Sequence, residues 1–207
     1  MKVELEDWKK RLEKPLGLAS QLKMSPDMRA ADIDNFGNKK NLLQSAVLIL
    51  LYKKNGCLQM LLTKRSTKLN KHRGQISFPG GKKDDSDLDL LQTAIREARE
   101  EVGLNSSVEV LGELTPLMIP ITNFCVHSFV SYIPHLPSIN FNTDEVESVL
   151  EVSVKALMQK DNVKYKNFGK TSSGRLVNAP YYDVNGVEIW GATAMIISEL
   201  IETLFVE

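Results

Sequence analysis

The stretch that decides the fold runs from residue 80 to residue 104 and reads GGKKDDSDLDLLQTAIREAREEVGL. Two glycines open it, an acidic segment follows, and the remainder has the spacing of an amphipathic helix. At about 100° per residue, Glu97, Glu100 and Glu101 share one sector of that helix. The adjoining sector is apolar and holds Leu91, Ala94, Ile95, Ala98 and Val102. We expect the helix to bury its apolar side and to present the three carboxylates outward.

Both ends of this helix carry recognisable signals. Asp89 and Gln92 lie three residues apart and form a variant of the capping box. Gly103 is the residue type with which helices commonly end. The paired glycines Gly80 and Gly81 allow a tight loop before the helix. The sequence therefore predicts a loop, a helix and a second loop that hold acids beside a substrate.

The acidic run has two interpretations. Taken alone, it is typical of a solvated helix face with intrahelical ion pairs, such as Arg96 with Glu100. Alternatively, a bound cation relieves the repulsion among neighbouring carboxylates, which amounts to roughly a few tenths of a kcal/mol per pair. Hard oxygen ligands favour Mg²⁺ or Mn²⁺, and these ions take phosphate oxygens as further ligands. The second interpretation predicts a phosphate or diphosphate substrate attacked by activated water, with a carboxylate as general base.

The composition indicates one globular domain with extensions, since 207 residues with 43% hydrophobic content can bury a sizeable core. Lysine plus arginine and aspartate plus glutamate both number 26, so the charge balance points to neither a nucleic-acid nor a membrane partner. The longest apolar run, residues 46–52, is far shorter than the roughly 20 residues of a membrane span. The first residues do not resemble a secretory signal, and a cytoplasmic location is expected.

The two cysteines, Cys57 and Cys125, are too few for a disulfide framework, which fits a reducing compartment. Neither lies in a common metal-ligand spacing. His127 and His135 lie in or beside a predicted strand without a ligand partner in register, and we expect both to be structural.

Elsewhere the pattern predicts strands that alternate with helices, hence a layered α/β or α+β fold. Asn55-Gly56 and Asn185-Gly186 are signals for type I′ hairpin turns between β-rich runs. The predicted strands cover residues 45–52, 57–63, 108–117, 124–133, 180–184 and 187–190. Helices are predicted over residues 3–16 and 192–206, and an acidic segment at 144–157 precedes a short helix. We expect residues 1–41 to form an N-terminal helical extension and residues 42–207 the main domain.

The stretch from Gly81 to Leu104 resembles the Nudix box of the Nudix hydrolases, in which a glycine, an acid, Arg-Glu, Glu-Glu and a glycine recur at fixed spacing. Asp87 stands where the family has a glutamate, and the interval from Asp87 to Arg96 is one residue longer than the general pattern. Both features are typical of the coenzyme A pyrophosphatase branch. A second signature of this branch is matched by LLTKRS at residues 61–66 and GQISFPGG at residues 74–81.

A few further positions bear on this resemblance. Leu69 and His72 fit the second signature, whereas Asn70 stands where the pattern has a basic residue. The segment WGATA at residues 190–194 is also similar to this branch. The two motifs together cover about a fifth of the chain.

The resemblance implies the Nudix fold, a mixed β-sheet sandwiched between α-helices. It implies hydrolysis of the diphosphate of coenzyme A or its derivatives to 4′-phosphopantetheine, or its acylated form, and adenosine 3′,5′-bisphosphate. Two alternatives stay open. One is hydrolysis of another nucleoside diphosphate derivative, such as ADP-ribose or a dinucleotide. The other is a non-catalytic module that binds a nucleotide-like ligand.

Roles for single residues follow from the same resemblance. Glu97, Glu100 and Glu101 are the expected ligands of Mg²⁺ or Mn²⁺, and Glu97 and Glu100 count among the catalytic residues. Gly80 and Gly81 are expected to line the substrate site.

Residues outside the acidic helix complete the expected site. A carboxylate outside the box often assists in this family, and Glu145 is the best candidate, although a charged loop is an equal alternative. Arg65, His72 and Lys64 are expected to contact substrate phosphates. Arg96 and Asp87 are expected to support the site. The predicted partner is a small molecule, with the protein acting as a monomer or a homodimer.

Overall fold

A computed structural model describes residues 2–27, 42–68, 73–119, 122–170, 174 and 176–206. The helical elements are α1 (Lys2–Leu12), α2 (Leu18–Leu22), α4 (Leu90–Val102), α5 (Val154–Leu157), α6 (Gly191–Phe205) and the 3₁₀ turn η2 (Lys160–Asn162). The first strands are β1 (Leu43–Lys54), β2 (Cys57–Arg65), β3 (Ile76–Ser77), β4 (Gly80–Lys82), β5 (Glu109–Glu113) and β6 (Leu117–Ile119). The remaining strands are β7 (Phe124–Ile133), β8 (Val146–Ser153), β9 (Val163–Lys170), β10 (Leu176–Val184) and β11 (Val187–Trp190).

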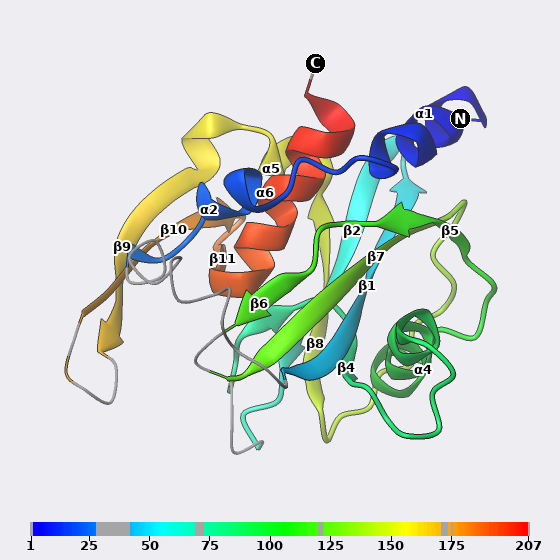
Figure 1. The fold of residues 1–207 in the computed structure, drawn as a ribbon, viewed down its shortest axis with the longest axis horizontal. Coiled ribbons are helices and arrows are strands. Elements are labelled where there is room, and N and C mark those ends of the chain that lie inside the picture. Colours follow the sequence, from blue (N-terminus) through cyan, green and yellow to red (C-terminus); the bar gives the residue numbers. More distant parts are fainter. Residues whose placement is uncertain are drawn as a thin grey trace.

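The central feature is a mixed sheet of eight strands (Figure 1). Its main path runs β3-β2-β1-β7-β5, while β4 pairs with β1, β6 with β7 and β8 with β2. Strands β1 and β7 are parallel, whereas β1 and β2 are antiparallel. A second sheet has the order β11-β10-β9. The predicted mixed sheet is confirmed.

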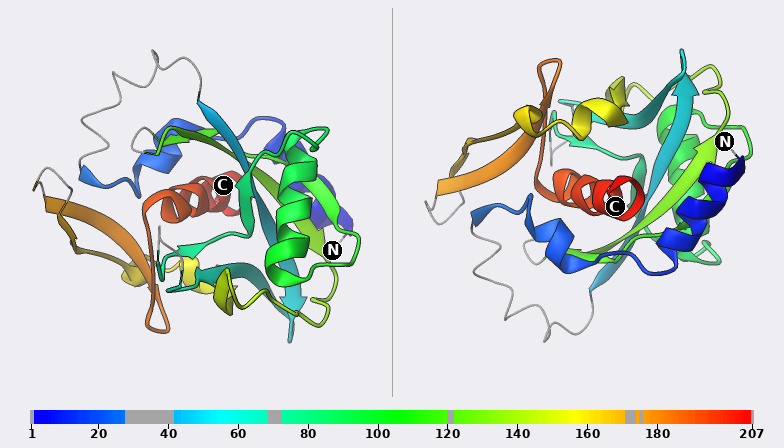
Figure 2. Two further views of the ribbon diagram at one scale, coloured as in Figure 1. Left: turned by 90° about the horizontal axis from the view of Figure 1, so that it is seen from below. Right: turned by 90° about the horizontal axis from the view of Figure 1, so that it is seen from above.

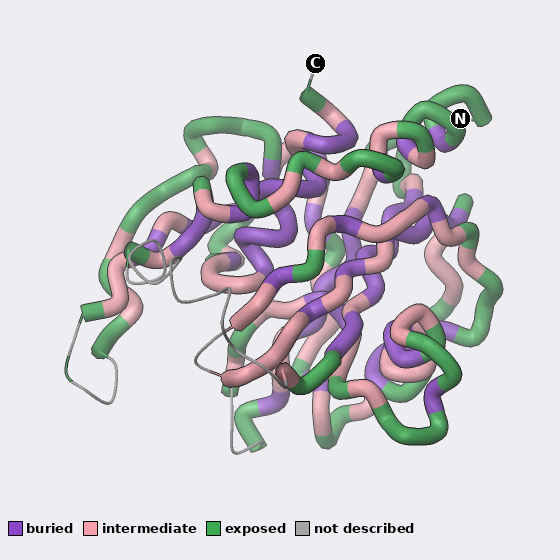
Figure 3. The backbone as a smooth tube through the Cα atoms, in the orientation of Figure 1, coloured by how far each residue is buried: buried purple, intermediate pink, exposed green. Residues whose placement is uncertain are grey.

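Strand β1 forms the middle of the core because it is apolar on both faces. Ala46, Leu48 and Leu50 pack in the cluster that includes the apolar side of α4. Ile49 and Leu51 belong to the opposite cluster, which includes α6 and α1. Figure 2 shows the sheet between α4 on one face and α6 on the other. In Figure 3 the buried residues concentrate along these central strands and on α6.

Both predicted hairpins are confirmed. Asn55 and Gly56 have φ values of 52° and 77°, and they join Lys54 and Cys57, which are paired across the strands. Asn185 and Gly186 repeat this conformation between β10 and β11. The matched left-handed residues are those that a type I′ turn requires.

The N-terminal residues differ in detail from the prediction of one helix over residues 3–16. Helix α1 ends at Leu12, and the short α2 follows after Pro15 and Gly17. Trp8 of α1 contacts Phe205 of α6 edge-on, with ring centroids 5.4 Å apart. A helix is therefore present at this end, as predicted, but residues 28–41 of the expected extension lie outside the described part.

The fully buried Glu199 of α6 joins several segments. Its carboxylate accepts hydrogen bonds from the backbone N–H of Gly17 at 2.9 Å, from Nε2 of Gln21 at 2.7 Å and from the N–H of Thr115 at 3.2 Å. These contacts connect the N-terminal residues to α6 and to the segment between β5 and β6.

Several strands of the two sheets depart from the sequence-based prediction. Residues 108–117 were expected to form one strand, but β5 ends at Glu113 and β6 begins at Leu117. Pro116 lies in the gap, and a proline cannot donate a hydrogen bond to a strand ladder. Strands β8 and β9 were not predicted, because charged residues mask their alternation. Among the described residues, no helix is long and apolar enough to cross a membrane.

Replacement of Gly103 tests how firmly the end of α4 is packed. Gly103→Ala should lower the free energy of unfolding by about 2–3 kcal/mol, because a left-handed alanine is strained and its Cβ meets a backbone oxygen. The φ of Gly103 is 68°, and an added Cβ would lie 2.6 Å from the carbonyl oxygen of Asn140. Urea unfolding followed by tryptophan fluorescence measures this loss.

Gly56→Ala is the matched control, because Gly56 has a φ of 77° and open space around an added Cβ. It should lose only about 1 kcal/mol, the cost of the left-handed backbone. Equal losses in the two variants would contradict the packing argument.

Candidate active site

Helix α4 forms where the sequence predicts it, and its ends are fixed locally. The Asp89 carboxylate accepts a hydrogen bond from the N–H of Gln92 at 2.8 Å. At the other end Gly103 takes the left-handed conformation, and its N–H donates to the carbonyl of Arg99 at 3.0 Å. Ala94, Ala98 and Val102 are completely buried against β1. These contacts set the rotation of the helix and hence the direction of its acids.

The three glutamates of α4 lie in different surroundings, and the expectation that all three point outward was wrong for Glu101. Glu100 is exposed, Glu97 is partly buried, and Glu101 is only 2% exposed. The loop before the helix covers Glu101, whose carboxylate accepts the N–H of Gly80 at 3.2 Å. Nη1 of Arg65 lies 3.5 Å from the other oxygen of Glu101.

Arg96 connects the acidic loop to the helix carboxylates. Its Nε and Nη2 donate to the two oxygens of Asp87, both at 2.9 Å. Its Nη1 donates to Glu97 and to Glu100, again at 2.9 Å each. Such a two-pronged guanidinium contact fixes direction as well as distance. Arg96 thus holds Glu97 and Glu100 side by side.

Asp87 orders the loop, while Asp89 caps the helix. Besides Arg96, the Asp87 carboxylate accepts the N–H of Asp84 and the hydroxyl of Thr93, each at 2.9 Å. Arg96 holds the pKa of Asp87 well below its usual value, with the contacts from Asp84 and Thr93 acting in the same direction against burial.

Gly81 is in direct contact with the helix. A Cβ added at this position would lie within 2.6 Å of the carboxylate of Glu97, so a larger residue would displace that carboxylate. The adjacent Gly80 similarly lies against the backbone of Ala46 and Val47 in β1. The paired glycines thus let β4 lie between β1 and the acids of α4.

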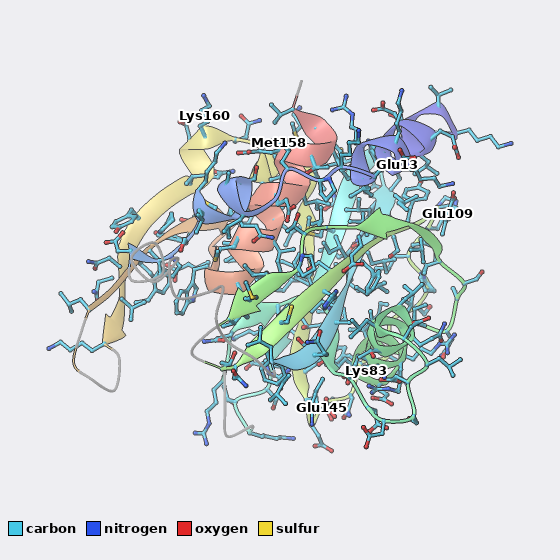
Figure 4. All side chains as sticks on the ribbon, in the orientation of Figure 1. Glu13, Lys83, Glu109, Glu145, Met158 and Lys160 are labelled. Carbon is cyan, nitrogen blue, oxygen red and sulfur yellow. The ribbon has the colours of Figure 1, made fainter. Side chains whose placement is uncertain are left out.

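Glu145 lies just before β8, and Figure 4 shows it at the end of the molecule where β4 and α4 meet β8. Its negative charge contributes to raising the pKa of both Glu97 and Glu101. The N–H of Ser66 donates to its carbonyl at 2.8 Å. Nδ2 of Asn142 donates to its carboxylate at 3.4 Å, and the N–H of Asn142 donates to the carbonyl of Glu101 at 2.9 Å. Asn142 therefore bridges Glu145 and helix α4.

The predicted basic residues fall in different places. Arg65 lies beside Glu101, and its Nε is buried without a hydrogen-bond partner among the described residues. Lys64 forms an ion pair with Glu147 on the paired strand β8. His72 lies outside the described residues. The Arg65 side chain as a whole is partly exposed, so the other nitrogens of its guanidinium are suitable contacts for a substrate oxygen.

Burial dominates the acid–base properties of the site. It raises the pKa of Glu101 to about 7, and the charges of Glu97 and Glu145 add to this effect, while Gly80 and Arg65 oppose it. Burial also raises the pKa of Glu97, against the opposing effect of Arg96. The site thus crowds carboxylates into a poorly solvated space, where their ionised forms require positive charge nearby.

The carboxylate oxygens of Glu97, Glu100 and Glu101 are ligands that suit a hard divalent cation. In the structure, however, these side chains are not arranged around a common point. Within the described ranges, no group of three or more His, Cys, Asp or Glu side chains is placed to hold a metal ion. Arg96 and Arg65 instead take up the carboxylates. A cation coordinated by Glu97 and Glu100 would replace the contact with Nη1 of Arg96, while the hydrogen bonds to Asp87 could keep that arginine in place.

Sequence reasoning missed the bridge made by Asn142 and the cover over Glu101. Asn142 begins the segment Asn-Thr-Asp-Glu, in which its side chain accepts the N–H of Asp144 at 3.1 Å. An asparagine that bonds the backbone two residues on is a recognisable turn signal. This signal indicates the turn but not its contact with α4.

Asp87→Asn should lower the free energy of unfolding at neutral pH by about 2 kcal/mol, because the amide lacks the negative charge that pairs with Arg96 and its NH2 group cannot accept one of the two hydrogen bonds. The pKa of Asp87 is lower in the folded than in the unfolded state. The Asp87 carboxylate therefore stabilises the fold fully when the pH is above the unfolded-state pKa of about 4, and this contribution decreases as the pH falls below that value. Urea unfolding at several pH values should show the difference from wild type shrinking from about pH 5 to pH 2. Asp85→Asn, at an exposed position of the same loop, should behave as wild type. A constant difference at all pH values would refute the role of the Asp87 charge.

Comparison with known proteins agrees with this geometry. Residues 42–170 match the NUDIX domain family. An uncharacterized Nudix hydrolase NudL from Citrobacter koseri is 37% identical over 167 residues, covering 79% of this chain and 84% of the relative. The NudL of Yersinia enterocolitica is 37% identical over 142 residues, covering 68% of this chain and 71% of the relative.

Among solved structures, a MutT protein from Methanosarcina mazei matches with a TM-score of 0.50 at 18% identity, over 78% of this chain and 93% of that one. A MutT/nudix family protein from Enterococcus faecalis matches with a TM-score of 0.50 at 15% identity, over 86% of this chain and 76% of that one. These structural matches concern the fold alone. From the family match and the sequence relatives, the chain belongs to the Nudix hydrolase family.

Proposed function

We propose that this protein hydrolyses the diphosphate of coenzyme A or a thioester or disulfide derivative of it. The products are 4′-phosphopantetheine, or its acylated form, and adenosine 3′,5′-bisphosphate. The observation that carries the proposal is the convergence of the charges of Glu97, Glu101 and Glu145, with the guanidinium of Arg65 3.5 Å from Glu101. Arg65 belongs to the motif at residues 61–66 that resembles the coenzyme A pyrophosphatase branch.

Nudix hydrolases use divalent metal ions such as Mg²⁺ or Mn²⁺, and the carboxylates of α4 suit such an ion. In our proposal Glu97, Glu100 and Glu101 hold it, and the carbonyl of Gly81 is available as a further ligand. When bound, the cation neutralises charge on the diphosphate and favours ionisation of the attacking water.

The protein groups then divide the remaining work. Glu145 accepts a proton from the attacking water, in a position that Asn142 and Ser66 fix. Arg65 donates hydrogen bonds to the diphosphate, and Lys64 contributes positive charge. His72, which lies outside the described residues, stays a substrate contact predicted from the motif. Gly80 and Gly81 bring the backbone of β4 close to the carboxylates of α4, and in our proposal this backbone contacts the substrate. Arg96 and Asp87 keep the glutamates in register.

Two alternatives use the same structure. The carboxylates would serve another nucleoside diphosphate derivative, such as ADP-ribose or a dinucleotide, equally well. A non-catalytic ligand-binding module is the other, but the retention of Glu97, Glu100 and Glu101 argues against it. What favours coenzyme A is the motif across residues 61–81, which adds basic side chains next to the box.

We further propose that the protein works in the cytoplasm, as a monomer or homodimer on a small-molecule substrate. The two free cysteines fit a reducing compartment.

Direct incubation tests the substrate. The protein with Mg²⁺, and separately with Mn²⁺, is incubated with coenzyme A, acetyl-coenzyme A, oxidised coenzyme A, ADP-ribose and diadenosine tetraphosphate, and the products are separated by ion-exchange chromatography. We expect adenosine 3′,5′-bisphosphate from the coenzyme A compounds. Cleavage of ADP-ribose without cleavage of any coenzyme A compound would overturn the proposal in favour of the first alternative.

Glu100→Gln should abolish measurable turnover while leaving the unfolding midpoint nearly unchanged, because Glu100 is exposed and its contact is with Arg96. Steady-state kinetics and thermal unfolding measure the two properties. Full activity in this variant would show that Glu100 does not hold the catalytic ion.

Glu145→Gln should lower kcat by about 10²- to 10⁴-fold with a smaller change in KM, as expected when a general base is removed. The matched control is Glu151→Gln on the adjoining strand β8, where the carboxylate pairs with Lys54 and Tyr52. This control should keep kcat within about two-fold of wild type. Similar losses in both variants would indicate a structural effect of β8 and not a role for Glu145 as base.

A further inference from the structure

A group of side chains whose types can bind metal ions lies at one end of β1 and β7 and shares no residue with the proposed catalytic site. Sγ of Cys125 is 3.7 Å from Nε2 of His127. Oε1 of Gln44 is 3.1 Å from the same nitrogen. The other ring nitrogen, Nδ1, lies 2.6 Å from the carboxylate of Glu113. A sulfur, a nitrogen and an oxygen atom therefore face one another.

The strand register produces this grouping. In the parallel pair of β1 and β7, Gln44 is opposite Cys125, and Ala46 is opposite His127. Cys125 and His127 are two residues apart, so their side chains point to the same face of the sheet. Glu113 of β5 is opposite Phe129, two residues beyond His127, and so joins that face.

The hydrogen bonds around the group direct its lone pairs inward. The short contact to Glu113 favours a proton on Nδ1 of His127, which leaves the lone pair of Nε2 for the interior of the group. Nε2 of Gln44 donates to the carbonyl of Leu42 at 3.1 Å, so Oε1 is the amide atom that faces His127. Two acceptor atoms at 3.1 Å repel each other unless a proton or a metal ion lies between them.

The separations suit a metal ion. Zn²⁺ binds thiolate sulfur at about 2.3 Å and imidazole nitrogen or oxygen at about 2.0–2.2 Å, so tetrahedral ligands lie roughly 3.4–3.6 Å apart. The observed 3.7 Å and 3.1 Å bracket this range. The contact of Nδ1 with Glu113 also matches the carboxylate that commonly orients a metal-binding histidine.

We propose that Cys125, His127 and Gln44 form a site for a thiophilic divalent ion such as Zn²⁺, with Glu113 orienting the imidazole. The fourth position is taken by water. The thiolate and imidazole distinguish this site from the carboxylates of α4, which select hard ions. Because its third protein ligand is an amide oxygen, the site is compatible with the absence of three clustered His, Cys, Asp or Glu ligands among the described residues.

Binding of the metal ion to the sulfur of Cys125 releases one proton. Burial, followed by the charge of Glu113, raises the pKa of Cys125, so the free protein carries a thiol. The sulfur–metal bond forms as the sulfur–hydrogen bond breaks, and the proton passes to solvent. No oxidant or reductant is involved.

Cobalt titration tests the proposal without any measurement of catalysis. The full-length, metal-free protein is titrated with Co²⁺ in excess Mg²⁺, and the near-ultraviolet charge-transfer absorption of a cobalt–thiolate bond is recorded. We expect the band in wild type and its disappearance when Zn²⁺ is added. Because carboxylates give no such band, the outcome is independent of the proposed hydrolase function.

Variants assign the band to its ligands. Cys57→Ser is the matched control and should keep the band, because Cys57 is the other, exposed cysteine. Cys125→Ser should lose it, and Glu113→Gln should bind Co²⁺ about 10- to 100-fold more weakly. His127→Ala and Gln44→Ala should also bind more weakly, and circular dichroism checks that each variant is folded.

Several results would overturn the proposal. These are no thiolate band in the wild type, a band that survives in Cys125→Ser, or wild-type affinity in both folded His127→Ala and Gln44→Ala. The last result would show that a cysteine alone binds the ion.

Discussion

Burial of carboxylates at the C-terminal part of α4 is the constraint on which the rest of the site depends. Burial raises the pKa of both Glu97 and Glu101, and the charge of Glu145 adds to the effect at each. Two guanidinium groups offset the negative charge of these carboxylates. Arg96 contacts Glu97, and Arg65 lies beside Glu101. Both arginines come from elements whose positions are fixed by backbone pairing or by a cap. The charge balance is therefore built into the fold.

The same arrangement explains why the loop from β4 to α4 is acidic. Asp87 accepts hydrogen bonds from Nε and Nη2 of Arg96. Nη1 of the same arginine therefore points to Glu97 and Glu100. A loop without this acid would leave Arg96 free to lie along the helix, as an ordinary i,i+4 partner does. The loop therefore selects one orientation of the arginine out of several.

Local signals in the sequence were sufficient for the hairpins, for α4 and for the apolar strand at the centre. Asn55-Gly56 and the cap at Asp89 act over two or three residues, so no distant partner is needed to predict them. Strands β8 and β9 depend on partners far along the chain, and their charged outer residues hide the pattern. The burial of Glu101 was missed because a helical wheel contains no information about the loop that covers it. The closeness of Gln44 to Cys125 and His127 was also missed, because it depends on the parallel register of β1 and β7.

The buried Glu199 limits where the chain can be truncated at its N-terminal side. Its carboxylate draws all three of its hydrogen-bond donors from Gly17, Gln21 and Thr115. Two of these donors precede the segment that matches the NUDIX family, which begins at residue 42. Removing the leading residues would take away two of these three donors and leave buried oxygen atoms of Glu199 without them, which is costly. The leading residues also contribute Leu5, Trp8 and Leu12 to the main hydrophobic core, so α1 belongs to the same packed unit as the segment that matches the NUDIX family.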